Sequence, residues 1–295
     1  MSWQVLNITK PGKLWLKNAQ CIYSIDEGEE VSFALDNISV IVLESAYVSV
    51  TSSLLKRIAE NNIVLFICPD THTPCGIYYP FMQYFSYSKT ANMQKEWTVP
   101  FKNRIWQIIV KNKINNQAAV LESNFKDGAE KLRFIARGAE TGDDANAEGV
   151  AAAQYWKFLF GQDFVRDSAN HINAALNYGY SLLRGAITRS LAASGFVPCF
   201  GLHHNNYLNA FNLADDIIEP FRPIVDAKVL LMREQGLLEE GLLPSVKPEL
   251  LKILLGTVYF NKENVGVLTA CDYSCQSLSK ATAEKDYRLF KTPEL

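Results

Sequence analysis

The sequence predicts an α+β protein in which a small β-rich N-terminal domain precedes a larger all-α C-terminal domain. Short apolar runs separated by turn residues fill residues 1–80, whereas apolar residues recur at helical spacing from Phe101 onward. A chain of 295 residues is long enough for two domains. We expect the β-rich domain to end near Tyr79-Pro80, a connector to span 81–100 and the helical domain to span 101–295.

Three strands and one helix are predicted within the β-rich domain. Val31–Leu35 alternates apolar and polar residues at period two, and Ser39–Leu43 and Ile63–Ile67 are short β-branched runs. Turn residues such as Pro11-Gly12 separate these runs. A short helix is expected over Ser52–Asn61.

The helical domain is predicted from a long apolar stripe and from helix-end signals. Apolar residues recur every three or four positions in its first helix, which places them on one face: Trp106, Val110, Ile114, Ala118 and Leu121. Further helices are expected from about Asn146 to Phe160 with Gly161 as C-cap, from Asn170 to Ser194, after Asn212 as N-cap and, as the last one, from near Pro248.

The charge is unevenly distributed along the chain, although the net charge is only −2. Residues 81–140 hold 10 Lys and Arg against 5 Asp and Glu, whereas residues 141–240 hold 7 against 12. Cations bind phosphates and carboxylates bind divalent metal, so this pairing suits a metal-dependent nucleic-acid enzyme. Ordinary variation of surface charge is the alternative interpretation.

The cysteines and the N-terminal segment indicate a cytoplasmic protein. The six cysteines are scattered, with Cys271 and Cys275 as the closest pair, and we expect reduced, buried thiols. No apolar run typical of a secretory signal opens the sequence, and no segment is apolar enough to predict a membrane span.

A polar loop and a nearby acidic helix form the first candidate site. His203-His204 lies in a loop, Gly201–Asn206, that offers little apolar surface for burial in a core. Asp215, Asp216 and Glu219 follow at helical spacings that allow all three carboxylates to crowd together. Such crowding needs a compensating cation, for which Arg222 is the candidate, and Pro220 is expected to kink this helix.

Glu148 is the third candidate, because small residues follow it on the next helical turns and Tyr155 lies on the same helical face. Together with His204 and Glu219 it would make a hard, oxygen-rich site for Mg²⁺ or Mn²⁺. The spacing alone does not establish that the three converge, and a dipole-driven enrichment of acids at helix starts is the competing interpretation. His72 and His171 are expected to be surface or capping residues.

Three stretches resemble the CRISPR spacer-acquisition integrase, the Cas-one family, and most closely its type II variant. They are Arg104–Gln117, Ala147–Trp156 and Gly201–Pro223, and the last of them is long and specific. The length and the β-then-helical order also fit, so the resemblance covers nearly the whole chain. Carried over by position, it implies Glu148, His204 and Glu219 as metal ligands and Asp216 as a supporting acid near the metal.

The resemblance implies a metal-dependent DNA endonuclease and integrase that uses Mg²⁺ or Mn²⁺. Such an enzyme inserts short captured DNA fragments into a CRISPR array, with a DNA 3′-hydroxyl attacking a phosphodiester of the repeat. It also implies a homodimer, formed through the β-rich domain, and an assembly of two dimers around a dimer of the small ferredoxin-like Cas-two protein.

DNA backbone contacts are expected on the basic helix and beside the acidic one. The candidates are Lys102, Arg104, Lys111, Lys113 and Arg222. Two other functions stay open: a non-catalytic DNA-binding scaffold that uses the acids structurally, and a metal hydrolase acting on small molecules. An HNH-type nuclease built on His203-His204 and Asn212 is disfavoured, because no pair of strands precedes the helix.

Overall fold

The computed structural model describes residues 4–25, 28–61, 63–68, 75–78, 87–143, 145–243 and 245–295. The chain forms two compact units, residues 1–85 and 86–295. The first is rich in strands and the second is mostly helical, which confirms the predicted fold class. The predicted positions of His72 and of the domain end at Tyr79-Pro80 lie outside the described residues.

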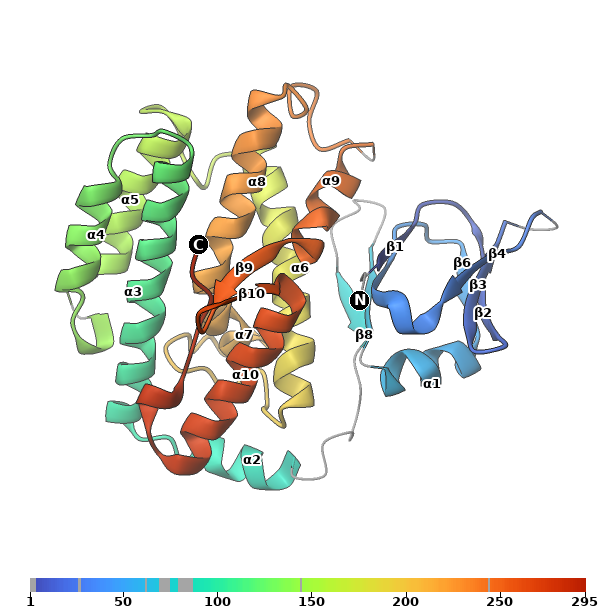
Figure 1. The fold of residues 1–295 in the computed structure, drawn as a ribbon, viewed down its shortest axis with the longest axis horizontal. Coiled ribbons are helices and arrows are strands. Elements are labelled where there is room, and N and C mark those ends of the chain that lie inside the picture. The colour runs from blue at the N-terminus through green and yellow to red at the C-terminus, as the bar shows by residue number, and fades with distance from the viewer. Residues whose placement is uncertain are drawn as a thin grey trace. The chain divides into compact units, whose positions relative to one another are not determined.

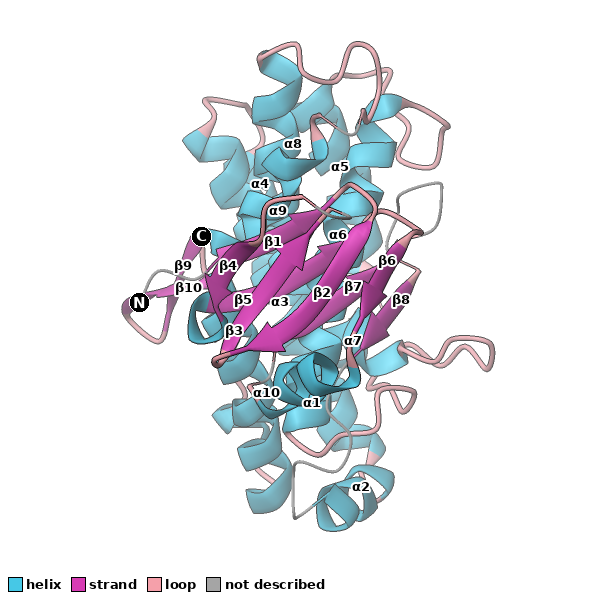
Figure 2. Ribbon diagram, turned by 90° about the vertical axis from the view of Figure 1, so that its right-hand side faces the viewer, coloured by secondary structure: helices cyan, strands magenta, loops and turns pink. Residues whose placement is uncertain are grey.

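The N-terminal unit contains two four-stranded sheets that lie face to face (Figures 1 and 2). One has the order β1-β5-β7-β8, with β1, β5 and β7 parallel and β8 antiparallel to β7. The other has the order β4-β3-β2-β6, with β6 parallel to β2. The strands are β1 Gln4–Ile8, β2 Gly12–Lys17, β3 Gln20–Ser24, β4 Val31–Ala34, β5 Ile38–Leu43, β6 Val48–Val50, β7 Val64–Ile67 and β8 Gly76–Tyr78.

The apolar core of this unit draws on both sheets and on helix α1, Ser52–Glu60. Every residue of β5 is buried, and the strand is central in its sheet. Leu14 of the second sheet and Leu54 of α1 belong to the same buried cluster. The three predicted strands and the predicted helix are therefore confirmed within two residues.

The second unit is built around the long helix α3, Val99–Ser123 (Figure 1). Helices α4 and α5 pack along one side of α3, and α8 packs against both α3 and α6. The helices are α2 Tyr87–Lys95, α3, α4 Ala129–Gly138, α5 Ala147–Phe160, α6 His171–Ala193, α7 Asn212–Ile217, α8 Arg222–Glu234, α9 Lys247–Leu251 and α10 Val267–Glu284. Short 3₁₀ turns occupy Leu35–Asn37, Thr141–Asp143, Glu219–Phe221, Lys252–Leu255 and Tyr287–Leu289.

The predicted apolar stripe of α3 is confirmed, since all five of its residues are buried. Asn146 caps α5 by accepting a hydrogen bond from the backbone N–H of Gly149, and Gly161 ends the helix with φ of 108°. Asn212 was expected to be an N-cap but is the first residue of α7. Its side-chain amide donates hydrogen bonds to the backbone carbonyls of Cys199 and Asn206 in the preceding loop.

Helices α2, α4 and α10 and strands β9 Thr257–Phe260 and β10 Glu263–Gly266 were not predicted. The helix expected near Pro248 as the last one is the short α9, which α10 follows. Helix α2 lies inside the expected connector, and the β9–β10 hairpin interrupts the expected all-α domain before α10. The buried side-chain amide of Gln94 in α2 forms hydrogen bonds with the backbone of Val197 and Phe200. A polar contact with a distant segment therefore fixes α2, and its sequence lacks the apolar periodicity that predicts a helix.

The cysteines are reduced, and four of the six are buried. Burial raises the pKa of Cys21 to about 11 and raises the pKa of Cys271 and Cys275 further. These thiols are therefore packing groups rather than nucleophiles. None of the helices in the described ranges combines the length and apolar character that a membrane span needs.

Candidate metal centre

Lys113 of α3 brings two of the three predicted metal ligands together. Its Nζ lies 2.5 Å from Oε1 of Glu148 and 2.5 Å from Oε2 of Glu219. The Lys113 side chain is only 11% exposed. Burial lowers the pKa of Lys113, but Glu219 and Glu148 outweigh it and raise the pKa above its ordinary value. The two carboxylates thus converge on one buried ammonium group.

Glu148 is placed by a capped helix start. It is the second residue of α5, and the Asp143 carboxylate accepts hydrogen bonds from the backbone N–H of Ala147 at 2.8 Å and of Glu148 at 3.1 Å. Asn146 adopts a left-handed conformation with φ of 53° and holds the next N–H, that of Gly149. The two caps satisfy the free N–H groups of the first turn and fix the direction of the Glu148 side chain.

Glu219 is placed by the break between α7 and α8. The prediction that Pro220 interrupts the helix is correct, because Glu219–Phe221 forms a 3₁₀ turn there. Asn116 of α3 donates to the carbonyl of Pro220 at 2.8 Å and so ties the break to the central helix. Arg222 pairs with Glu219 as predicted, with Nε 2.9 Å from Oε1.

The electrostatic surroundings of Glu219 favour its ionised form. Burial raises the pKa of Glu219, but Lys113 and Arg222, with a smaller effect of His204, hold it below its ordinary value. A buried carboxylate is thereby kept charged by cations from two neighbouring elements.

The imidazole of His204 is oriented by Asp216. Its Nδ1 lies 2.8 Å from Oδ1 of Asp216, and the same carboxylate accepts hydrogen bonds from the backbone N–H groups of Leu202, His203 and His204. Asp216 is fully buried. Its hydrogen bond raises the pKa of His204 above the ordinary value. The contact leaves the other ring nitrogen of His204 for a ligand, an arrangement common for metal-binding histidines.

The neighbouring His203 has a different role. Its ring stacks on the buried Trp106 with centroids 4.2 Å apart and planes 1° apart. The ring of His204 stands edge-on to both. The two neighbouring rings therefore have different surroundings, and the choice of His204 over His203 as a ligand stays a prediction.

The prediction that Asp215, Asp216 and Glu219 crowd together is wrong. Asp215 turns to Arg184 of α6, whose Nε lies 2.8 Å from its Oδ1. Asp216 points under the histidine loop, and Glu219 points to Lys113 and Arg222. Each carboxylate has donors of its own, so the repulsion that helical spacing suggested is relieved in three directions.

The three predicted ligands therefore lie around one region without forming a closed coordination sphere. Among the residues that the structure describes, no group of three or more His, Cys, Asp and Glu side chains is arranged to hold a metal ion. The ammonium of Lys113 stands between Glu148 and Glu219 instead. The donor set nevertheless fits Mg²⁺ or Mn²⁺, because two carboxylates converge from separate elements and an oriented imidazole acts electrostatically on one of them.

The expected DNA-binding residues divide into two groups. Lys102 and Lys111 are half-buried on α3, and Arg104 is exposed, with its guanidinium 5.8 Å from the ring of Tyr287. Lys113 is buried and Arg222 is half-buried, and both are paired with Glu219. DNA contact by any of these five residues stays a prediction.

A cavity of about 200 Å³ adjoins the centre and contains a second acidic group. Asp226 is buried and accepts hydrogen bonds from the hydroxyl groups of Tyr155 and Tyr180. Burial raises the pKa of Asp226 to about 7 despite these bonds and the nearby cations. The cavity is lined by Lys113, Gln117, Ala152, Trp156, Arg166, Tyr180, Glu219, Arg222 and Asp226.

Several residues that shape the centre were not predicted from the sequence. Asn116, Asp143, Arg184 and Asp226 act through contacts with distant segments. Of these, only Asp143 carried a local signal, because an acid a few residues before a helix start is a typical capping position.

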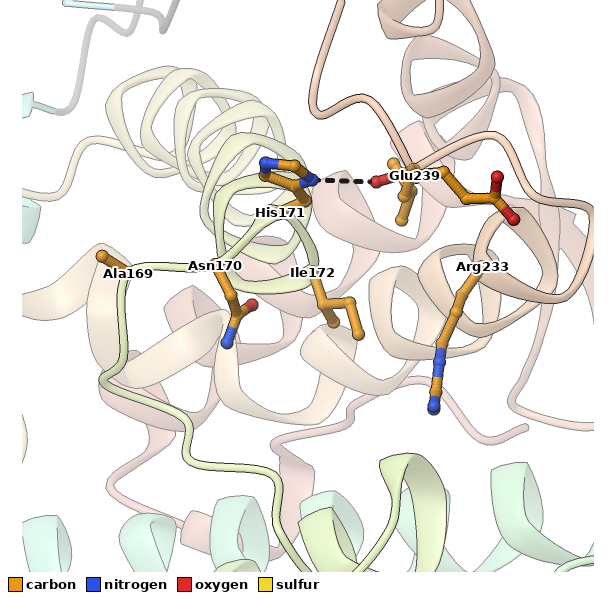
Figure 3. Close-up of a pocket in the computed structure, with 7 residues that line it drawn as sticks. Ala169, Asn170, His171, Ile172, Arg233 and Glu239 are labelled. Carbon is orange, nitrogen blue, oxygen red and sulfur yellow. Dashed lines mark hydrogen bonds between the residues drawn. The ribbon is translucent and has the colours of Figure 1, made fainter.

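A second cavity, of about 450 Å³, lies away from the centre, beside the start of α6 (Figure 3). Its His171 contacts the backbone carbonyl of Leu238 at 3.1 Å, which agrees with the predicted role outside a metal site. Figure 3 shows the side chains of Arg233 and Glu239 pointing in different directions. The polar groups do not converge, so this cavity has no evident chemistry.

The comparisons with known proteins identify the family. The profile of the family described as CRISPR associated protein Cas1 matches residues 6–242. A CRISPR-associated endonuclease Cas1 from Neisseria meningitidis serogroup C is 38% identical over 296 residues, which cover 100% of this chain and 97% of the relative. A CRISPR-associated endonuclease Cas1 from Thermus thermophilus is 34% identical over 46% of this chain and 41% of the relative.

Solved structures share the fold at lower identity. A casposase bound to an integration product is 18% identical, covers 97% of this chain and 91% of its own, and has a TM-score of 0.75. A Cas1 protein from Thermotoga maritima is 19% identical with a TM-score of 0.54, over 96% of this chain and 97% of its own. The resemblance found in the sequence is confirmed: the chain belongs to the Cas1 family of CRISPR-associated proteins.

Proposed function

We propose that this chain is a divalent-metal-dependent DNA endonuclease and integrase that inserts short foreign-DNA fragments into a CRISPR array. The observation that carries the metal site is the convergence of Glu148 and Glu219 on one buried cation, Lys113. Family membership supports the activity, since the Neisseria relative is named an endonuclease. The shared fold with a casposase bound to an integration product agrees with strand transfer.

Glu148, His204 and Glu219 would hold Mg²⁺ or Mn²⁺. Carboxylate oxygens suit both ions, and an imidazole nitrogen is acceptable to Mn²⁺ in particular. When bound, the ion would favour the deprotonated form of the attacking hydroxyl and neutralise charge on the phosphorane-like transition state.

The residues of the chain supply orientation and charge. Asp216 holds Nδ1 of His204, so the other nitrogen is presented in a fixed direction. Lys113 and Arg222 place positive charge beside Glu219, where a phosphate of DNA would be attracted. In the reaction, a DNA 3′-oxygen forms a bond to phosphorus while the bond from that phosphorus to the adjacent oxygen of the repeat strand breaks, and no phosphoanhydride is consumed.

The partners follow from the same proposal. We expect the chain to bind DNA, to form a homodimer through the strand-rich unit and to assemble with a Cas2 dimer. A solved complex titled Cas6-RT-Cas1--Cas2 shares the fold with a TM-score of 0.72 at 18% identity, covering 99% of this chain and 36% of its own. We expect the chain to act on DNA in the cytoplasm.

The test replaces Glu219 by Ala and measures Mn²⁺- or Mg²⁺-dependent strand transfer into a repeat. Strand transfer should be abolished while DNA binding largely persists, because Glu219 is a ligand and not an outer DNA contact. Asp163→Ala is the matched control, since Asp163 is an exposed acid beyond the end of α5. Normal strand transfer by Glu219→Ala would contradict the assignment.

A non-catalytic DNA scaffold is the second candidate, because the pairing of Lys113 with both carboxylates is also what a structural ion-pair network shows. A scaffold binds DNA equally well in chelator and never cuts it. A small-molecule metal hydrolase predicts no affinity for duplex or branched DNA at moderate salt. Strand transfer that stops on adding chelator therefore excludes both.

A further inference from the structure

The ammonium of Lys113 stands where a cation bridging Glu148 and Glu219 would stand. One oxygen of each carboxylate lies 2.5 Å from its Nζ, so the two oxygens are separated by at most twice that distance. The Glu219 side chain is 5% exposed and that of Glu148 is 26% exposed. Two largely desolvated carboxylates this close repel each other strongly unless a positive charge separates them.

The charges of the four paired side chains balance without a metal ion. Lys113 and Arg222 carry two positive charges, and Glu148 and Glu219 carry two negative ones. A divalent cation added to this set would leave an excess of two positive charges in a buried site, which is unfavourable. Binding therefore requires either that Lys113 withdraws or that a negative group, such as a DNA phosphate, enters.

Lys113 is suited to withdraw. A lysine side chain is a compact charge on a flexible four-carbon stem. It lines the cavity of about 200 Å³ that also contains Arg166 and Asp226. Arg222 is more constrained, because its planar guanidinium lies 4.7 Å from the ring of Tyr180.

We propose that Lys113 is a built-in competitor of the metal ion: it holds Glu148 and Glu219 in position without metal and must leave them when a divalent cation binds. This inference rests on the proposed metal site. It makes Lys113 a positioning residue that links metal occupancy to the arrival of a DNA phosphate, toward which the displaced ammonium can turn. A purely structural lysine would instead be needed for metal binding, because its loss would disorder both ligands.

The test measures Mn²⁺ affinity without DNA, from the loss of the free-ion EPR signal, for the wild type, Lys113→Met, Glu219→Gln and Lys228→Met. Lys113→Met should bind Mn²⁺ more tightly than the wild type, by about tenfold or more, since a competing charge is removed. Lys228→Met is the matched control, because Lys228 is a half-buried lysine paired with Glu249 and should leave the affinity unchanged. Glu219→Gln should bind Mn²⁺ much more weakly.

The outcomes separate this inference from the proposed function. If the wild type binds Mn²⁺, Glu219→Gln weakens binding and Lys113→Met does not tighten it, the competitor role is overturned and the metal site stands. If Mn²⁺ does not bind, or binds equally well to Glu219→Gln, the metal site and the competitor role are both overturned.

A measurement on the unaltered side chain covers the case in which Lys113→Met does not fold. In protein labelled with ¹⁵N-lysine, the buried, ion-paired ammonium of Lys113 should give a slowly exchanging NMR signal, assigned by its loss in Lys113→Arg. Added Mg²⁺ should shift or remove this signal. A signal that is unchanged at Mg²⁺ concentrations that saturate the protein would overturn the inference.

Discussion

At the scale of single residues, Asp216 determines both the position and the titration of His204. Its carboxylate receives the imidazole Nδ1 and three backbone N–H groups of the loop that carries the histidine. A group whose folded pKa is raised adds stability that is fully present below its unfolded pKa and is lost as pH rises through the folded pKa. The folded pKa of His204 is raised, so its protonated form persists to higher pH than that of an ordinary histidine.

Asp216→Asn should lower the pKa of His204, because the negative partner of the imidazolium is removed. Metal binding needs the neutral ring, so the pH below which Mn²⁺ affinity is lost should also move downward. NMR titration of the imidazole signals measures the first effect, with His171 as the control in the same spectra. An unchanged or higher midpoint for His204 would show that Asp216 does not set its pKa.

The ionisation of Asp226 also affects the stability of the fold. Its pH dependence has the opposite sign to that of an ion-paired surface carboxyl, whose pKa is lowered on folding. Burial raises its folded pKa to about 7, whereas the unfolded value is about 4. Between these values the unfolded state has released a proton that the folded state still holds. Stability from this group is therefore present at low pH, is lost as pH rises from about 4 to about 7 and is constant above that.

Asp226→Asn should remove this dependence, because the amide stays neutral at every pH. The free energy of unfolding of the wild type, relative to that of the variant, should fall by about 2.5 kcal/mol between pH 5 and pH 7.5. Urea unfolding at both pH values measures it, and Asp163→Asn serves as an exposed control. A difference between wild type and variant that does not change with pH would show that Asp226 titrates as an ordinary carboxyl.

At the scale of elements, the site depends on where helices begin and end. Glu148 stands in the first turn of α5, and Glu219 stands in the 3₁₀ turn that separates α7 from α8. Helix ends leave free backbone groups, and the capping side chains that satisfy them also fix the direction in which neighbouring side chains point. Both carboxylates are therefore held by the geometry of a helix end rather than by the middle of a helix.

Asp143→Ala tests this role for α5. The change removes two hydrogen bonds to the backbone N–H groups of Ala147 and Glu148 and should reduce the free energy of unfolding by about 1–2 kcal/mol. It should also weaken Mn²⁺ binding, since Glu148 loses its fixed direction. Calorimetry measures both quantities, with Asp163→Ala as the control; tight Mn²⁺ binding by Asp143→Ala would mean that the cap does not position the ligand.

At the scale of the whole molecule, DNA affinity should be governed by the basic segment that includes α3. Binding of cationic side chains to phosphates releases counterions, so affinity should fall linearly with salt on logarithmic axes. Outside the metal centre, Lys102, Arg104 and Lys111 are the expected source of this dependence, because they are not paired with its two carboxylates.

Lys111→Ala should reduce the slope of log affinity against log salt by about one, the change expected for one lost phosphate contact. Fluorescence anisotropy with a labelled DNA duplex across a salt series measures the slope. Lys228→Ala, which removes a lysine paired with Glu249, should leave it unchanged. Equal slopes for Lys111→Ala and the wild type would remove Lys111 from the DNA-binding surface.

The elements could be predicted from the sequence where local periodicity is strong. The α3 stripe, the strands β5 and β7 and the ends of α5 are confirmed because apolar spacing and capping residues act over a few neighbouring positions. Helix α2 was missed because it is fixed by a polar contact with a distant segment. The β9–β10 hairpin was missed because Glu263–Gly266 has no apolar, β-branched run like those of β5 and β7.

The sequence by itself determined the family, the fold class and the identity of the candidate ligands, because these are carried by motifs and by local patterns. Only the tertiary structure decided which charged side chains pair. Lys113, expected to contact DNA, pairs with the two carboxylates. Asp215 pairs with Arg184, and Asp216 lies beneath the histidine loop. The physical reason is burial. A charge removed from water must find its partner wherever packing brings one, and the contacts that result join segments far apart in the chain.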